Sequence, residues 1–422
     1  MLSIAMIREY RETVERELAR KGYTEGLDKI VELDEEMRET LTEFETKRAY
    51  QKQLSKKVGM AKAKGEDPSE LFAEGKTLAQ TVKDFEAKTE RLRSELTRAM
   101  LHVPNLPDED VPNGADESEN MLVSEHGALR EFAFKPLAHW DLLRKGNMLD
   151  GGTGAKLSGS GFNCLRNDLA KLERALIDYM IDIHVAEHGY EEISTPFIAR
   201  EDSMKGTGQL PKFHDDMYKL EDTDLYLIPT AEVTLANCYR DTIFGSEELP
   251  RKICGYTPCF RKEAGAAGRD TRGLIRVHQF SKVELINFTT PDKSDEQLQT
   301  MISEATKILD RLQLPYRLML LCTGDMTFSS ARTIDIEAYC PGVERWLEIS
   351  SCSNCRDFQA RRMKTRFKDE DNRNQLVHIL NGSGLALPRL LVAIAENYQQ
   401  EDGLVRIPQV LKKYFPGKDF LG

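Results

Sequence analysis

Four arginines gather in one glycine-rich stretch of the chain, residues 260–280, at Arg261, Arg269, Arg272 and Arg276. A guanidinium group is permanently charged and presents a planar fork of N–H donors that fits phosphate oxygens. The glycines of the stretch allow the backbone to close over a ligand. Strand-like runs flank the stretch, so a basic surface hairpin without a ligand is the alternative. The composition favours a phosphate-binding loop.

Two further segments carry small residues or prolines at unusual places. A turn of small residues at 381–386 precedes an apolar helix expected over residues 390–397, and Arg389 lies in its first turn. The helix dipole disfavours a cation there unless an anion offsets it, so this position indicates a phosphate. The other segment is a helix over residues 172–187, followed by a turn and a strand that ends at Pro196. Taken alone, that segment indicates no chemistry.

The elements around these segments predict an α+β fold. Strand-like runs occur at residues 225–229, 280–288, 316–322 and 333–338, without the regular strand–helix alternation of a parallel sheet. We therefore expect an antiparallel β-sheet flanked by helices. The chain contains neither a G-x-x-x-x-G-K-[ST] loop nor a G-x-G-x-x-G fingerprint, so nucleotide binding requires another design.

The N-terminal part predicts two long helices. Apolar steps of three and four residues indicate a helix over residues 27–60, and a break follows at 65–70. There Asp67 is a good N-cap, Pro68 suits the first helical position, and Glu70 can close a capping box. A seven-residue seam then runs to about residue 101, at Leu71, Leu78, Phe85, Leu92 and Ala99. Together they predict an antiparallel coiled-coil arm of roughly 50 Å, rather than a hairpin packed into a bundle.

Charge along this arm is uneven. Residues 47–64 hold seven bases and no acid, namely Lys47, Arg48, Lys52, Lys56, Lys57, Lys62 and Lys64. Such a run fits phosphate binding, and a solvated surface with cross-helix pairs is the alternative. Residues 105–127 read as a linker rich in Pro, Gly, Asn and acids, so we place an N-terminal domain at 1–104 and a second domain at 128–422.

Composition excludes several classes of protein. The 422 residues are 40% hydrophobic and 31% charged, and no apolar run approaches the roughly 18–20 residues that span a bilayer. With no signal-peptide pattern either, we expect a cytoplasmic protein without a membrane partner. The net charge of −11 is not that of a typical nucleic-acid binder, yet a local basic patch still binds phosphate. Eight scattered cysteines fit reduced thiols; Cys254, Cys259, Cys352 and Cys355 leave a zinc site as an alternative to buried structural thiols.

The three segments resemble motifs 1, 2 and 3 of class II aminoacyl-tRNA synthetases, and their sequences are similar to those of the seryl-tRNA synthetase family. Further matches are Thr230-Ala231-Glu232, the run at residues 272–280 and the run at residues 348–353. The resemblance extends over the whole chain, including the arm. It implies a class II catalytic domain and a ligase that activates L-serine with ATP and transfers it to tRNA(Ser), and to tRNA(Sec) as well.

The resemblance also implies the nucleotide site. Arg261, Arg389 and Glu348 would be catalytic: Arg261 would grip the α-phosphate and the serine carboxylate, and Arg389 the γ-phosphate. Glu348 and Ser351 would bind Mg²⁺, for which oxygen ligands are suitable. Glu263 would read adenine, Phe280 would stack on it, and Arg276 would assist on the phosphates. The full ATP set would be Arg261, Lys262, Glu263, Arg276, Val277, Phe280, Glu348, Ile349, Ser350, Ser351 and Arg389.

The implied serine pocket consists of Thr230, Ala231, Glu232, Arg261, Glu284, Asn381 and Ser383. A site that hydrogen-bonds a hydroxyl can reject alanine by roughly 10⁴–10⁵, because its own polar groups would be left unpaired. Taken alone, Thr230 and Ser383 fit turn or capping roles, and Glu348 an ordinary strand carboxylate. No protein nucleophile is required, and we expect a structural hydrogen-bonding role for His278.

The family is homodimeric, with motif 1 at the interface, and its arm reaches tRNA bound mainly on the partner subunit. Two positions depart from the pattern: Lys262 replaces a small polar residue, and Pro388 a common glycine. Two alternatives stay open. One is a paralogue that delivers serine to a biosynthetic route or confers inhibitor resistance; the other is a non-catalytic RNA-binding protein on the same scaffold.

Overall fold

The computed structural model describes residues 1–263 and 272–422. The chain divides into two compact units. The N-terminal unit comprises Leu2–Ala19 and Tyr23–Pro104, and the C-terminal unit comprises Met1, Arg20–Gly22 and Asn105–Gly422. Within the described ranges, no helix is long and apolar enough to cross a membrane.

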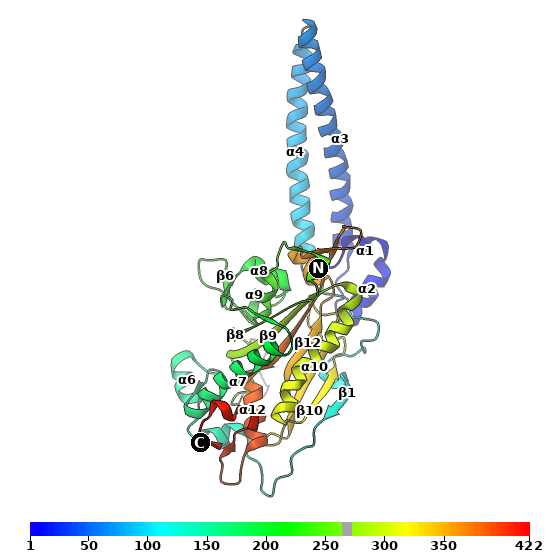
Figure 1. Cartoon of the computed structure of the whole chain (residues 1–422). Coiled ribbons are helices and arrows are strands. Elements are labelled where there is room, and N and C mark those ends of the chain that lie inside the picture. The colour runs from blue at the N-terminus through cyan, green and yellow to red at the C-terminus, as the bar shows by residue number, and fades with distance from the viewer. Residues whose placement is uncertain (264–271) are drawn as a thin grey trace. The chain divides into compact units, whose positions relative to one another are not determined.

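Two long helices, α3 (Asp28–Lys64) and α4 (Ser69–Met100), dominate the N-terminal unit and run side by side (Figure 1). Leu54 of α3 and Leu78 and Leu92 of α4 are buried. With a rise of 1.5 Å per residue, the 37 residues of α3 extend about 55 Å. The predicted antiparallel coiled-coil arm is confirmed. Two short helices, α1 (Ile4–Glu9) and α2 (Arg11–Arg20), precede it.

The turn between the long helices differs slightly from the prediction. Gly65 ends α3 in the left-handed conformation, with φ of 72°, and its N–H bonds back to the carbonyls of Ala61 and Lys62. Helix α4 begins at Ser69, one residue later than expected, so Pro68 lies at the N-cap position rather than inside the first turn. Asp67 precedes the N-cap, and its Oδ1 still accepts the N–H of Ser69, the first helical residue, at 3.0 Å.

An eight-stranded sheet forms the centre of the C-terminal unit. Its strand order is β1-β10-β11-β12-β15-β9-β8-β4, and the pairs are antiparallel apart from β4 with β8. The predicted antiparallel sheet is therefore confirmed. The strands are β1 (Met121–His126), β4 (Glu191–Glu192), β8 (Arg251–Phe260), β9 (Gln279–Thr289), β10 (Tyr316–Leu320), β11 (Arg332–Cys340), β12 (Arg345–Asn354) and β15 (His378–Ala386).

Three helices share a hydrophobic core with this sheet: α7 (Asn167–Ala186), α10 (Ser294–Leu312) and α12 (Leu387–Tyr398). On β9, Val283 and Leu285 are fully buried in that core. The alternate residues of the strand, Lys282 and Glu284, point to the opposite face, because successive side chains alternate along a strand. The main core thus lies on one face of the sheet, and the other face carries polar groups at Lys282 and Glu284 beside a second hydrophobic cluster that contains Ile286 and Phe288.

Two irregularities change the alternation on that polar face. In β12, Ser350 pairs with Ile336 but Glu348 pairs with Glu337, so one extra residue is inserted between them. This bulge brings Glu348 and Ser351 to the same face, although they are three positions apart. In β15, Ser383 pairs with Glu284 and Leu385 with Val283, so Gly384 is the extra residue. Leu385 takes a positive φ of 131°, which is a strained backbone for a branched side chain.

Two expectations about local structure are wrong. Residues 381–386, predicted as a turn of small residues, form the end of β15, which pairs with β12 on one side and β9 on the other. Pairing on both sides outweighs the low strand preference of the glycines. The residues expected to form a linker also contain β1, the edge strand of the sheet.

Shorter elements complete the C-terminal unit. The helices are α5 (His139–Lys145), α6 (Gly151–Ser158), α8 (Glu201–Thr207), α9 (Glu232–Asn237) and α11 (Phe358–Met363). The strands are β2 (Leu149–Asp150), β3 (Cys164–Leu165), β5 (Ile198–Arg200), β6 (Leu225–Leu227), β7 (Ile243–Phe244), β13 (Arg366–Lys368), β14 (Asn374–Leu376), β16 (Val405–Arg406) and β17 (Phe420–Leu421).

The cysteines are all free thiols. Cys254, Cys259, Cys352 and Cys355, the four considered for zinc, are buried. Among the described residues there is no group of three or more His, Cys, Asp or Glu side chains placed to hold a metal ion. Burial raises the pKa of the Cys352 and Cys355 thiols to about 12, which favours the protonated thiol over a metal-binding thiolate.

Candidate active site

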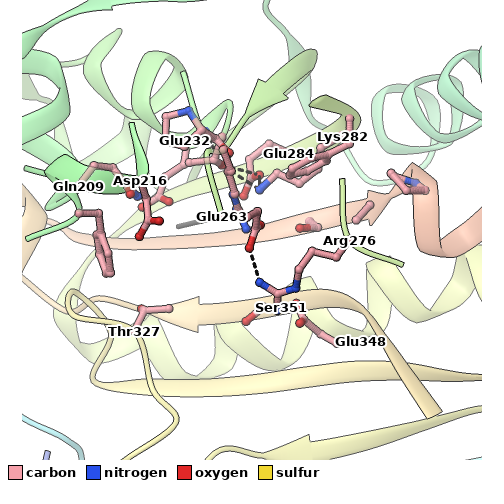
Figure 2. Close-up of a pocket in the computed structure, with 18 of the residues that line it drawn as sticks. Gln209, Asp216, Glu232, Glu263, Arg276, Lys282, Glu284, Thr327, Glu348 and Ser351 are labelled. Carbon is pink, nitrogen blue, oxygen red and sulfur yellow. Dashed lines mark hydrogen bonds and ion pairs between the residues drawn. The ribbon is translucent and has the colours of Figure 1, made fainter. Parts of the chain in front are cut away.

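The polar face of the sheet forms the floor of a cavity of about 720 Å³, within the range typical of small-molecule sites. Strands β9, β12 and β15 contribute its floor, and residues near the ends of α8, β8 and α12 contribute its walls. Figure 2 shows acidic and basic side chains from these elements converging on one space. Such a mixture suits a ligand that carries charges of both signs.

One end of the cavity contains a buried network around Glu284. The ammonium group of Lys282 forms an ion pair with the Glu284 carboxylate and donates a hydrogen bond to Thr230 Oγ1 at 2.8 Å. The Thr230 hydroxyl in turn donates to Glu284 Oε2 at 3.1 Å. All three side chains are less than a tenth exposed. This end is therefore a desolvated site where an ammonium group is already bound by a carboxylate.

Glu232, at the start of α9, forms the second carboxylate of this end. Its Oε1 accepts an N–H from Gln359 at 2.6 Å and another from Asn381 at 3.2 Å. Burial, and next the negative charge of Glu284, raise the pKa of Glu232 to about 7. The two carboxylates therefore create a region of unfavourable negative potential that a cationic ligand would relieve.

The other end of the cavity carries three guanidinium groups. Arg261 lies 5.2 Å from the centre of the Phe280 ring, and its Nε donates to the Pro229 carbonyl at 3.2 Å. Arg276 forms an ion pair with Glu263. Arg389 bonds to the Glu348 carboxylate at 2.9 Å and to the Glu348 carbonyl at 2.8 Å. Arginine pairs of this kind are suited to exchange a carboxylate for a phosphate.

The charge of Glu348 is maintained by its surroundings. Burial alone would raise the pKa of this carboxyl group, but the cations of Arg389, Arg261 and Lys282 bring it below its usual value. Asp335 lies opposite Ser351 in the β11–β12 pair. Burial, and then Glu348, raise the pKa of Asp335 well above its usual value, and Asp335 Oδ1 has no hydrogen-bond partner among the described residues.

Most of the residues expected at the site line this one cavity. The three residues expected to be catalytic, Arg261, Arg389 and Glu348, are among them. The others are Thr230, Glu232, Glu263, Arg276, Val277, Phe280, Glu284, Ser351, Asn381 and Ser383. Residues 264–271, with Arg269 and two glycines of the expected phosphate loop, lie outside the described residues.

Four expected residues do not line the cavity. Ala231 and Ile349 are buried in the hydrophobic core, and the Ser350 hydroxyl donates to the Ser383 carbonyl at 2.7 Å. The β12 bulge explains both residues, because Ile349 is the extra residue and Ser350, opposite the buried Ile336, turns away from the polar face as well. The N–H of Lys262 bonds to the Asp216 carbonyl, and its ammonium lies over Tyr218. His278 hydrogen-bonds to the backbone of Arg261, which is the structural role expected for it.

The structure adds residues that sequence reasoning missed. Lys282 lies between Phe280 and Glu284 with a spacing of two residues, so strand alternation was a usable signal for it. Asp216 and Gln209 reach the cavity from the segment after α8, and Gln359 supports Glu232 from α11. No spacing in the sequence relates these residues to the motifs.

The basic residues of the arm lie on the second half of α3. Arg48, Lys52, Lys56, Lys57, Lys62 and Lys64 are exposed, while Lys47 is half-buried and lies 3.8 Å from Glu43. Cross-helix pairs occur elsewhere on the arm: Lys88 bonds to Glu36 at 2.9 Å, and the Tyr50 hydroxyl to Glu74 at 2.6 Å. The exposed bases are thus available to an anionic partner.

Comparison with known proteins gives the same assignment along the whole chain. Residues 1–107 match the family model of the seryl-tRNA synthetase N-terminal domain, and residues 218–398 match the tRNA synthetase class II core domain (G, H, P, S and T). The serine–tRNA ligase of Thermomicrobium roseum is 48% identical, covering 100% of this chain and 95% of that protein. That of Natranaerobius thermophilus is 47% identical over 100% of both.

Solved structures agree with this result. Seryl-tRNA synthetase from Pyrococcus horikoshii, complexed with ATP, has a TM-score of 0.91 at 37% identity and covers 100% of this chain and 99% of its own. The cytoplasmic serine–tRNA ligase of Naegleria fowleri, in complex with AMP, has a TM-score of 0.86 at 31% identity, with 100% and 98% covered. The chain therefore belongs to the seryl-tRNA synthetase family of class II aminoacyl-tRNA synthetases.

Proposed function

We propose that this chain activates L-serine with ATP and transfers the seryl group to the terminal adenosine of tRNA(Ser), using the cavity on the polar face of the sheet. In the first step the serine carboxylate attacks the α-phosphorus, the bond to the β-phosphate oxygen breaks, and pyrophosphate leaves. In the second step a ribose hydroxyl of the tRNA attacks the seryl-adenylate and releases AMP. The observation that carries the proposal is the convergence of Arg261, Arg389 and Glu348 on this cavity.

The guanidinium end of the cavity would bind ATP. Arg261 would contact the α-phosphate and the serine carboxylate, and Arg389 the γ-phosphate, so that two negatively charged reactants are held together. Phe280 would stack on adenine. Once a phosphate replaces Glu263 as the partner of Arg276, Glu263 would accept a hydrogen bond from the adenine amino group. Because phosphoryl transfer needs little covalent help from the protein, positioning and charge neutralisation supply the catalysis.

The acidic end would bind serine. The substrate ammonium group would replace Lys282 as a partner of Glu284 and also interact with Glu232. Thr230, Asn381 and Ser383 offer hydrogen-bonding groups for the substrate. A substrate without a hydroxyl would leave such groups unpaired, so we expect alanine to be rejected.

The residues on β12 fit a magnesium ion. The bulge presents an oxygen of Glu348 and the Ser351 hydroxyl on the same face, and the buried Asp335 with its unpartnered Oδ1 lies beside them. Oxygen donors of this kind are those that Mg²⁺ prefers. When bound, the ion would neutralise charge on the ATP phosphates. Glu348 and Ser351 would hold it, while Arg389, released from Glu348, would turn to phosphate.

The remaining proposals concern tRNA binding by the arm, formation of a homodimer and the cellular site of action. The exposed bases of α3 would contact tRNA phosphates, including those of tRNA(Sec). A homodimer, with the motif 1 segment of residues 172–196 at the interface, would present each arm to tRNA bound mainly on the partner subunit. The cytoplasm is the proposed site of action.

Pyrophosphate exchange measured with each of the twenty amino acids tests the activity. We expect exchange with serine, and we expect Arg261→Ala to reduce it by about 10³-fold. The exposed Arg373 provides a control, because Arg373→Ala also removes one guanidinium but lies outside the cavity. Exchange that persists in Arg261→Ala would contradict the assigned role. Adenylation without charging of a serine tRNA would instead identify a paralogue that delivers serine elsewhere.

A further inference from the structure

Gln359 lies behind the serine end of the cavity rather than in it. The residue belongs to α11 and is fully buried, and it is not among the residues that line the cavity. Its Nε2 group donates to Glu232 Oε1 at 2.6 Å and to the Thr207 carbonyl at 2.9 Å. Both donor positions of the amide are therefore used, one of them on a carboxylate that faces the cavity.

The orientation of this amide is determined by its neighbours. Gln359 Oε1 is buried and has no hydrogen-bond partner among the described residues. Turning the amide over would give that oxygen no donor, because it would then face the Glu232 carboxylate and the Thr207 carbonyl, which are both acceptors. An unpartnered buried carbonyl destabilises a fold. The observed orientation therefore stabilises the Glu232 carboxylate although it leaves Gln359 Oε1 without a hydrogen bond.

We propose that Gln359 is a positioning residue for serine recognition, which holds Glu232 Oε1 so that Glu232 Oε2 is presented to the substrate ammonium group. The inference rests on the proposed function and deepens it. Asn381 assists from β15, because its Nδ2 group meets the same oxygen at 3.2 Å. Two amide donors on one oxygen fix the plane of the carboxylate and favour its ionised form.

Charged groups from every neighbouring element act on Glu232. Glu284 on β9 opposes its ionisation, and the thiol of Cys355, after β12, lies close by. Lys282 on β9 and Arg261, after β8, favour ionisation, but substrate binding would displace Lys282 from Glu284 and engage Arg261 with anionic groups. Gln359 favours ionisation without being a candidate for ligand exchange. Gln359 therefore continues to stabilise the ionised form of Glu232 while serine and ATP change the ion pairs of the other groups.

The pH dependence of serine use tests this role. We expect kcat/KM for serine in the wild type to fall below an inflection near pH 7, where Glu232 takes up a proton. Gln359→Met keeps the length of the side chain but removes both donors, so the inflection should move up by about one pH unit. The loss would be about fivefold at pH 7 and much smaller at pH 8.5. The dissociation constant for ATP, measured without serine, should not change.

A double-mutant cycle separates positioning from a general packing role. In a Glu232→Gln background the residue at 232 no longer ionises, so Gln359→Met should cause no further shift of the pH profile. A loss that is the same at every pH, or the same in both backgrounds, would overturn the proposal. If Gln359→Met fails to fold, Gln359→Glu, which keeps size and shape, decides the question. Two neighbouring carboxylates should move the inflection further up, and an unmoved inflection would overturn the proposal.

The same measurements distinguish this inference from the function on which it rests. A wild-type enzyme without serine-dependent exchange would contradict the proposed function. A wild-type enzyme that activates serine, together with Gln359 variants that match it at every pH, would contradict only the role of Gln359.

Discussion

The two carboxylates of the serine end should make the free enzyme less stable as the pH rises, and replacing Glu232 should remove this contribution. Burial and the charge of Glu284 raise the pKa of Glu232 from 4.5 in the unfolded chain to about 7 in the folded one. Between these values the folded chain holds a proton that the unfolded chain has lost, so folding stability falls as the pH increases. Glu232→Gln removes the titration, while its side-chain carbonyl can still accept from Gln359 and Asn381.

The size of the effect follows from the separation of the two pKa values. At about 1.4 kcal/mol per pKa unit, a shift from 4.5 to about 7 destabilises the folded wild type by about 3 kcal/mol at pH 8. At pH 5 the folded chain is still protonated at Glu232 and the unfolded chain is only partly ionised there, so the same calculation leaves about 1 kcal/mol. Glu232→Gln should therefore gain about 2–3 kcal/mol of stability relative to the wild type between pH 5 and pH 8.

Urea unfolding without ligands measures this difference. The chain has two tryptophans, Trp140 and Trp346, and both lie in the C-terminal unit, so their fluorescence reports the unit that contains the cavity. The exposed Glu221 provides a control, because Glu221→Gln also removes one carboxylate, but one that is exposed to solvent rather than buried. A Glu232→Gln variant with the same relative stability at pH 5 and pH 8, or one destabilised at pH 8, would refute the reasoning. A reduced but measurable rate of serine activation should accompany the gain in stability.

Three other perturbations test separate parts of the site. Lys282→Met leaves the buried Glu284 without its cation, so KM for serine should change by at least about tenfold while ATP affinity is retained; an unchanged KM would contradict the network. Ser351→Ala should raise the Mg²⁺ concentration for half-maximal exchange by about tenfold, and an unchanged Mg²⁺ dependence would remove Ser351 from the metal site. Replacing residues 47–76 with a short loop should preserve serine-dependent exchange but nearly abolish tRNA charging and its salt sensitivity, and equal losses in both assays would contradict the role of the arm.

The arm could be predicted from the sequence because its signals are local. The seven-residue seam and the glycine at the turn depend only on neighbours along the chain, and both helices formed within a few residues of the expected bounds. The small-residue segment at 381–386 shows the opposite case. A Cβ on Gly382 would come within 3 Å of Met301 and Cys352, so glycine is needed there for close packing rather than for a turn. That requirement comes from distant parts of the chain and is invisible in the local sequence.

The candidate site shows the same division. Most ligand residues could be named because they lie in contiguous motifs, and Lys282 could have been added from strand alternation. Glu348 and Ser351 are three residues apart, a spacing that places side chains on opposite faces of a regular strand. Only the bulge in β12, which depends on the register with β11, brings them together. Gln359 and Asp335 act through contacts between elements, and no pattern within the sequence relates them to their partners.

The ion pairs of the cavity explain how so many charges can be buried before any substrate arrives. Lys282 with Glu284, Arg276 with Glu263, and Arg389 with Glu348 each pair a cation with a carboxylate that serine, adenine or Mg²⁺ would contact in the proposed complex. Serine and ATP carry the matching charges, so binding can exchange internal partners for substrate partners without exposing an isolated charge. The free-energy cost of desolvating these groups is then offset during folding rather than during catalysis. This keeps the site preorganised for adenylate formation. No described residue forms an ion pair with Glu232, so amide donors from Gln359 and Asn381 supply its hydrogen bonds instead.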